Sequence, residues 1–196
     1  MRTRSVDWIS ERGPTFGSHD RLWHHGGRLP EHFVRHSREV AEFVGQTPEP
    51  ILDLGEDNPK IRIVSEVRGF TYTSCSDVDF DHEPIPGTWG TIFCLEILEH
   101  LYNPLLALEN MKRALGPGGV IYLSTPRRPH YLWFEEHFHE IDDRRIGWLF
   151  QRAGLCAVRR RLGARQDLRF HFSGIRPFLR LFTSTRIYEL RPTDPR

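Results

Sequence analysis

Residues 91–126 read TIFCLEILEHLYNPLLALENMKRALGPGGVIYLSTP, and this stretch decides the fold. Its first six residues are mostly apolar or β-branched, which predicts a buried strand. A helix should begin at Pro104, because Asn103 is a good N-cap residue and proline suits the first helical turn. Apolar side chains then recur at helical spacing, at positions 105, 108, 111 and 115.

The same pattern continues in both directions along the chain. The glycine-rich residues 116–119 end the helix, and residues 120–125 predict a strand that stops at Pro126. We expect further strands at 51–55, 70–74, 155–159 and 185–190, and further helices over 30–44, over 59–68 and from Asp142 or Asp143 toward Gly154. Strands that alternate with helices predict an α/β domain with a mostly parallel, twisted sheet, helices on both faces and ligands at the carboxyl ends of the strands.

Length and composition limit the kind of protein. A chain of 196 residues is of common size for one domain, which we expect over residues 30–196, after an irregular arm at residues 1–29. No apolar stretch approaches the roughly 18 residues of a membrane span. The three cysteines match no zinc spacing and suit a reducing compartment. We therefore expect a cytoplasmic protein without a membrane span.

Positive charge is concentrated near the end of the chain. The formal net charge is only +1 at pH 7, yet residues 157–196 contain ten arginines. This stretch either meets an anionic partner or forms a solvated basic face. Because no basic stripe interleaved with aromatic residues occurs elsewhere, a nucleic-acid partner is disfavoured.

Taken in order, four segments resemble the class I S-adenosylmethionine-dependent methyltransferases, especially the quinone-biosynthesis-like group of small-molecule O-methyltransferases. They are residues 51–55, 91–101, 103–104 and 113–126. The resemblance implies a Rossmann-like fold, S-adenosylmethionine as cofactor, and methyl transfer to a hydroxyl or other nucleophile of a small molecule. Only 43 residues separate Asp53 from Glu96, and a βαβ unit needs about 30, so we expect the sheet to be one βα crossover short.

The resemblance assigns the loop after the first strand to the cofactor. Asp53 and Gly55 match the acid and the first glycine of a Gly-x-Gly-x-Gly loop, whose glycines let the backbone approach the cofactor. The later glycines are replaced here by Glu56, Asp57 and Asn58. Either Glu56 and Asn58 contact the cofactor through an altered turn, or the loop no longer binds it.

Three further residues are candidates for the cofactor site. Asp79 is the acid expected near the adenosine end, and Phe80 beside it is expected to touch the adenine ring; the alternative is a solvated acidic turn. Glu96, at the end of the strand that starts at residue 91, is the third candidate.

The segment that starts at Glu96 also carries the clearest pattern for catalysis. Glu96, Glu99 and His100 stand at i, i+3 and i+4, so they can share one face of a helical turn. Such a set suits a divalent cation, Mg²⁺ or Mn²⁺, or a base oriented by acids. It resembles the metal-binding segment of quinone O-methyltransferases and of small-RNA 2′-O-methyltransferases, and His139, or alternatively His137, would complete it. The alternative is that these residues shape the pocket without a metal.

The loop after the strand at 120–125 should overhang the active site. Within it, His137 or His139 is a candidate general base beside His100, while Trp133, Phe134 and Phe138 would wall a substrate pocket. The alternative is that they dock the loop onto the domain. Arg176 and Arg180 are candidates for a substrate phosphate or carboxylate, or simply surface arginines.

Two other functions compete with small-molecule methylation. A binding or regulatory protein with a methyltransferase fold and no turnover would explain the altered glycine loop. A metal-dependent RNA 2′-O-methyltransferase would explain the arginine-rich stretch together with Glu96, Glu99, His100 and His139.

Overall fold

The computed structural model describes residues 29, 31–127, 137–139, 141–163 and 184–193. Four residues predicted to take part in the site lie outside this part of the chain, as does nearly all of the predicted arm at 1–29. They are Trp133, Phe134, Arg176 and Arg180.

Six strands form one sheet in the order β2-β1-β3-β4-β6-β5. Their bounds are β1 Ile51–Leu54, β2 Thr73–Cys75, β3 Trp89–Leu95, β4 Leu115–Arg127, β5 Leu155–Leu162 and β6 Ser184–Pro192. Only β6 runs against the other five, because it pairs antiparallel with both β4 and β5. The prediction of a mostly parallel sheet is confirmed.

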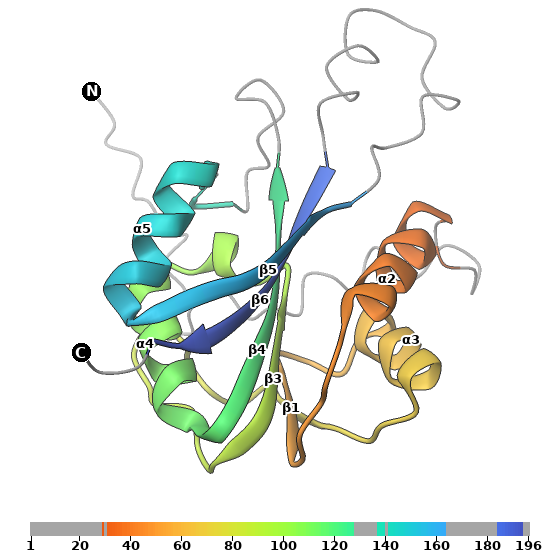
Figure 1. The fold of residues 1–196 in the computed structure, drawn as a ribbon, viewed down its shortest axis with the longest axis horizontal. Helices are drawn as coiled ribbons and strands as arrows, with labels where there is room; N and C mark the ends of the chain where they lie inside the picture. The colour runs from red at the N-terminus through yellow and green to blue at the C-terminus, as the bar shows by residue number, and fades with distance from the viewer. Residues whose placement is uncertain (1–28, 30, 128–136, 140, 164–183, 194–196) are drawn as a thin grey trace, which may run out of the picture.

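Two helices cover each face of the sheet (Figure 1). They are α2 Glu31–Phe43 and α3 Pro59–Arg68 on one face, and α4 Pro104–Ala114 and α5 Asp143–Ala153 on the other. Because successive strand residues point to opposite faces, Ile51 packs with α2 and α3 whereas Leu52 packs with α4 and α5. None of the described helices is both long and apolar enough to cross a membrane.

The expected loss of one crossover is visible between β2 and β3. Residues 76–88 connect these strands without a helix, and β2 lies at the edge of the sheet. β2 also starts three residues later than predicted. Phe70 is still bonded to the end of α3, since its N–H donates to the carbonyl of Ser65 and its carbonyl accepts from the Ser65 hydroxyl.

β4 differs from the prediction at both ends. It begins at Leu115, and residues 116–119 form an irregularity in its register against β3 rather than a separate loop. It also continues through Pro126, which pairs with Thr185 of β6. The Pro126 carbonyl accepts a hydrogen bond from buried Arg186, and the pairing of β4 with β3 has already ended at Ser124.

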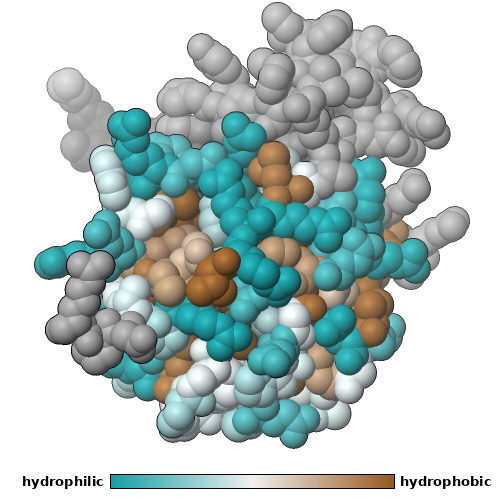
Figure 2. Space-filling model, viewed as in Figure 1, coloured by the Kyte–Doolittle hydropathy of each residue, from teal (hydrophilic) through white to brown (hydrophobic). Residues whose placement is uncertain are grey.

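The described arginines of β5 are held by acids of neighbouring elements. Arg159 binds Glu189 of β6, Arg160 lies 3.7 Å from Asp143 of α5, and Arg161 lies 3.1 Å from Glu42 of α2. On the face of the molecule seen in Figure 2, many side chains are hydrophilic, and hydrophobic ones lie among them. For these three arginines, the ion pairs favour a structural role over a nucleic-acid surface.

Candidate cofactor and catalytic site

Asp53 lies at the carboxyl end of β1 and is almost completely buried. Burial raises the pKa of its carboxyl well above the ordinary value, while the charge of Lys60 opposes this shift. Asp53 stands opposite Ser74 of β2 in the register of the two strands. Within the described residues, Asp53 Oδ2 and Ser74 Oγ have no hydrogen-bond partner, so this end of the sheet holds buried polar atoms that a ligand can satisfy.

The loop after β1 begins at the predicted glycine. Gly55 has a φ of 89°, in the region that favours glycine, and its N–H donates to the Cys75 carbonyl at 3.0 Å. Glu56 is exposed. The Asn58 side chain is used as the N-cap of α3, accepting from the N–H groups of Lys60 at 2.9 Å and Ile61 at 3.4 Å. Asn58 therefore stabilises the helix start, a role that the prediction of a cofactor contact missed.

A second set of contacts, not predicted, holds the same loop. Asp57 accepts two short hydrogen bonds, at 2.6 Å from the Arg62 guanidinium and at 2.6 Å from the Tyr72 hydroxyl. The Arg62 hydrogen bond is the main cause that lowers the pKa of Asp57. Burial and the neighbouring Asp57 raise the pKa of Tyr72. The signal in the sequence for this contact was the position of Asp57, five residues before Arg62 at the start of α3.

The acidic turn at residues 77–83 makes local structural contacts, and the burial of Phe80 corrects one prediction. Phe80 is only 2% exposed and packs in the core beneath α4, so its ring has no accessible face for adenine. The Asp79 carboxylate bonds the N–H of Asp81 at 3.0 Å and the ring of His82 at 2.9 Å. Asp81 in turn accepts from the N–H of Asn103 at 2.6 Å. The turn thus anchors the start of α4, and local hydrogen bonds already engage Asp79.

Glu96 lies at the carboxyl end of β3 with a φ of 60°, which is unusual for a residue other than glycine. Its N–H donates to the Ser124 carbonyl at 3.0 Å, and its Oε1 accepts from the Ser124 hydroxyl at 2.8 Å. The same oxygen lies 4.0 Å from Nε2 of His36 on α2. The strained backbone and the hydroxyl therefore aim this carboxylate at a defined place.

Three side chains that the sequence reasoning did not assign to the site come close to this edge. Lys60 is almost buried, and its Nζ lies 5.5 Å from the centre of the Phe33 ring on α2. Phe33 and His36 are three residues apart, so they share one face of α2. That helical spacing was the only sequence signal for their place beside the site.

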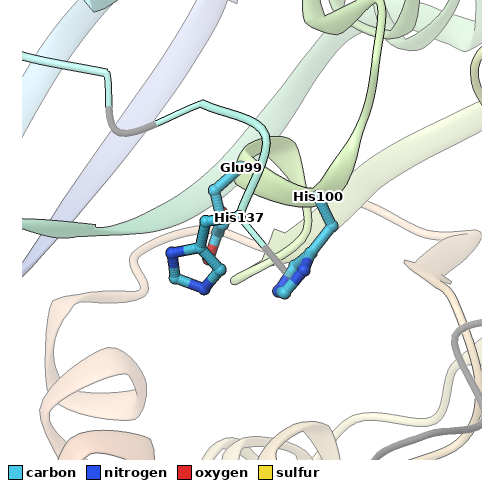
Figure 3. Close-up of side chains that lie close together, drawn as sticks. All are labelled: Glu99, His100 and His137. Atoms are coloured by element: carbon cyan, nitrogen blue, oxygen red, sulfur yellow. The ribbon is translucent and has the colours of Figure 1, made fainter. Parts of the chain in front are cut away.

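Glu99, His100 and His137 come together in space, and their potential ligand atoms all lie within 4.8 Å of one another. Glu99 and His100 belong to the short 3₁₀ helix η2 Leu98–His100, while His137 comes from the segment after β4. The two imidazole rings meet edge to face, with centroids 4.7 Å apart. Figure 3 shows the three side chains converging from these two segments. A buried carboxylate beside two imidazoles suits a divalent cation or an oriented base.

This group contains two of the four predicted metal ligands, Glu99 and His100. Glu96 stays outside it, because Ser124 holds the Glu96 carboxylate. His139 is also outside: its Nε2 lies 3.2 Å from the Tyr102 carbonyl, and its N–H donates to the Glu99 carbonyl at 3.1 Å. His137 occupies the third position in its place.

Comparison with known proteins places the chain in a family. A family model described as a methyltransferase domain matches residues 23–159, which include all the site residues described above. The chain belongs to this methyltransferase domain family. The resemblance found in the sequence and the Rossmann-like fold are confirmed.

Curated relatives of this methyltransferase domain include ubiquinone biosynthesis O-methyltransferases. The protein from Vibrio cholerae is 29% identical over 106 residues, which are 53% of this chain and 39% of that protein. The protein from Pseudomonas aeruginosa is 27% identical over 125 residues, 63% of this chain and 50% of that protein. The chain thus spans between two fifths and half of the length of these relatives.

Solved structures share the fold of the domain. Mitomycin 7-O-methyltransferase superposes with a TM-score of 0.58 at 14% sequence identity, covering 82% of this chain and 54% of that protein. At this identity the likeness concerns the fold alone.

Proposed function

We propose that this domain transfers a methyl group from S-adenosylmethionine to a hydroxyl of a small molecule. The observation that carries the proposal is the convergence of Glu99, His100 and His137 at the edge of the sheet where β1 and β3 end. The acids Asp53 and Glu96 stand at the ends of those same two strands. The histidines suited to proton removal and the two acids suited to a cationic cofactor therefore lie at the same edge of the sheet.

The residues at the end of β1 fit this cofactor. Asp53 and Glu96 offer carboxylate oxygens to its amino group and hydroxyls, and Asp53 Oδ2 is buried without a partner among the described residues. A side chain built on Gly55 would meet only Ile97 Cδ1, at 3.5 Å, so the loop leaves room beside it. When bound, S-adenosylmethionine supplies an electrophilic methyl group on a sulfonium.

His100 and His137 are the candidates for taking the proton of the acceptor hydroxyl. Glu99 lies beside both rings and can stabilise the imidazolium that forms. His139 is the poorer candidate because its ring is engaged by the Tyr102 carbonyl. Its backbone contact with Glu99 instead holds the loop that carries His137.

We further propose that Glu99, His100 and His137 can bind a divalent cation. Separations within 4.8 Å are close to those around one cation with ligands at about 2.1 Å. Mg²⁺ or Mn²⁺ held there would lower the pKa of an acceptor hydroxyl and orient it, and the two histidines would then act as its ligands instead of as the base. The RNA methyltransferase alternative has less support, because neighbouring acids hold the arginines of β5.

Calorimetry with S-adenosylmethionine and S-adenosylhomocysteine tests the cofactor site. We expect binding to the wild-type chain, weaker binding to Asp53→Asn, and unchanged binding to the matched control Asp79→Asn, whose carboxylate serves the local turn. Absence of binding at millimolar cofactor would reject catalysis and favour a binding protein without turnover.

Methyl transfer to a panel of hydroxylated compounds tests the catalytic group. His137→Gln should lose transfer while keeping cofactor affinity, and His139→Gln should retain most of it. Titration with Mn²⁺, followed by calorimetry, tests the metal: Glu99→Gln should abolish binding. Equal Mn²⁺ binding by Glu99→Gln and wild type would contradict the metal site.

A further inference from the structure

A groove with a volume of about 540 Å³ lies between the start of α4 and the outer side of α5. Pro104, residues 137–139 and Ile141 form one wall, and α5 forms the other. His137 lines this groove and also belongs to the Glu99–His100–His137 group. The groove therefore opens directly beside the group assigned to proton removal.

Two exposed aromatic side chains line the groove. Trp148 is 60% exposed and Phe138 is 43% exposed. The Phe138 ring lies against Tyr102, with centroids 4.1 Å apart. Large apolar side chains that gather at an open hollow mark binding sites more often than inert surface. A flat aromatic body is the chemistry that these rings accommodate.

The charges in the groove have one sign. Arg145 and Arg152 line it, and none of its lining residues is acidic. Arg145 already pairs with Asp142 at 3.4 Å. Arg152 has no carboxylate within 4.0 Å among the described residues. Both lie on α5 seven residues apart, so about 10 Å of helix separates them. Arg152 is the last residue of α5 that lines the groove.

We propose that this groove binds the methyl acceptor and that the acceptor is a hydroxylated aromatic acid. This inference rests on the proposed function. The hydroxyl faces His137, the aromatic body lies along Trp148 and Phe138, and the carboxylate or phosphate meets Arg152. A guanidinium recognises either anion through paired hydrogen bonds.

The dimensions favour a small molecule over a macromolecule. Sites for small ligands typically enclose about 300–1,000 Å³, and the groove falls within that range. A nucleic acid would require an extended surface of unpaired cations, and acids hold the described arginines of β5.

Three biphenyl probes test the inference on the full chain by calorimetry. They are 4′-hydroxybiphenyl-4-carboxylic acid, the phosphate ester that replaces its carboxyl, and the neutral 4′-(hydroxymethyl)biphenyl-4-ol. We expect at least one anionic probe to bind about 10- to 100-fold more tightly than the neutral one, the range for a charge-assisted hydrogen bond. Whichever anion binds more tightly identifies the acid that the site prefers.

Variants on α5 locate the probe. Arg152→Gln should remove the preference for the anion, and Trp148→Ala should weaken all three probes. Arg144→Gln is the matched control, because Arg144 lies on the same helix but does not line the groove. Both side chains to be replaced are surface groups, so each variant should unfold at the wild-type temperature.

The outcomes separate this inference from the proposed function. Equal binding of acid and neutral probe, no binding of any probe, or an equal effect of Arg144→Gln and Arg152→Gln would overturn the groove assignment. S-adenosylmethionine binding is measured in the same samples. If the cofactor binds and the acids do not, only this inference fails. If the acids bind with the expected preference and the cofactor does not, the proposed function fails, and the groove remains a site for aromatic acids that are not methyl acceptors.

Discussion

Nε2 of His36 lies 4.0 Å from Oε1 of Glu96, and this contact joins α2 to the carboxyl end of β3. Glu96 makes it from a left-handed backbone conformation, which costs a residue with a side chain about 1 kcal/mol or more. The Ser124 hydroxyl holds the same oxygen. A strained residue with two restraints on its carboxylate is typical of a site that binds a ligand.

Replacing Glu96 by Gln should weaken cofactor binding without lowering the stability of the fold. The amide oxygen can still accept from Ser124, so the unfolding temperature should stay near wild type. Loss of the charge should weaken S-adenosylmethionine binding about 10-fold, the value of one charge-assisted hydrogen bond. Ser124→Ala is the control: it should cost about 1 kcal/mol of stability and affect affinity less. Wild-type affinity in Glu96→Gln would contradict a cofactor role.

Asp53→Asn should change how stability depends on pH. Burial raises the pKa of Asp53, so its contribution to folding is complete below the unfolded-state pKa of about 3.9 and is lost as pH rises through the higher folded-state pKa. The variant removes that loss and should be more stable than wild type at pH 7. Between the two pKa values, the difference should grow by up to about 1.4 kcal/mol per pH unit. Urea denaturation at a series of pH values measures it, and a difference that does not vary with pH would refute it.

Gly55→Ala should damage both stability and cofactor binding. Gly55 has a φ of 89°, and a Cβ added there would meet only the Ile97 side chain, at 3.5 Å, so the cost comes from the backbone and should be about 1–2 kcal/mol. Gly118→Ala provides a matched control with a φ of 72° and open space around it. Both variants should lose similar stability in urea. Only Gly55→Ala should also bind S-adenosylmethionine less tightly, and equal affinities would argue against the loop as the cofactor site.

Arg186→Lys should destabilise the fold and the loop that carries His137. The buried guanidinium donates to the carbonyls of Pro126 and Ile141, the residues on either side of that loop. A lysine cannot reproduce this planar fork, so we expect a loss of about 2 kcal/mol or more in chemical denaturation. Arg160→Lys is the control. Arg160 is half exposed and 3.7 Å from its partner acid, and its replacement should cost less than about 0.5 kcal/mol.

Much of the fold could be predicted from short stretches of sequence. Asn103 caps α4 by accepting from the N–H of Leu106, and Asp142 caps α5 by accepting from Arg144 and Arg145. These hydrogen bonds span two or three residues, so the local sequence contains both partners. The alternation of Ile51 and Leu52 between the two core clusters likewise follows from the geometry of any strand.

The candidate site was harder to predict, because its members come from distant segments. His139 and His137 have similar sequence surroundings, yet only the His137 side chain joins those of Glu99 and His100, whereas His139 contacts Glu99 through the backbone. Phe80 was expected at the adenine ring, but burying its apolar surface in the core is more favourable than leaving it exposed.

The sequence by itself determined the order of strands and helices, the missing crossover and the family resemblance, since all of these depend on periodicity, caps and spacing along the chain. Only the tertiary structure decided that His137 joins Glu99 and His100, that His36 approaches Glu96, and that His137 and Arg152 line the same groove. The physical reason is that such contacts join segments tens of residues apart. Their geometry is set by how the helices pack on the sheet and by buried anchors such as Arg186, which no local pattern records.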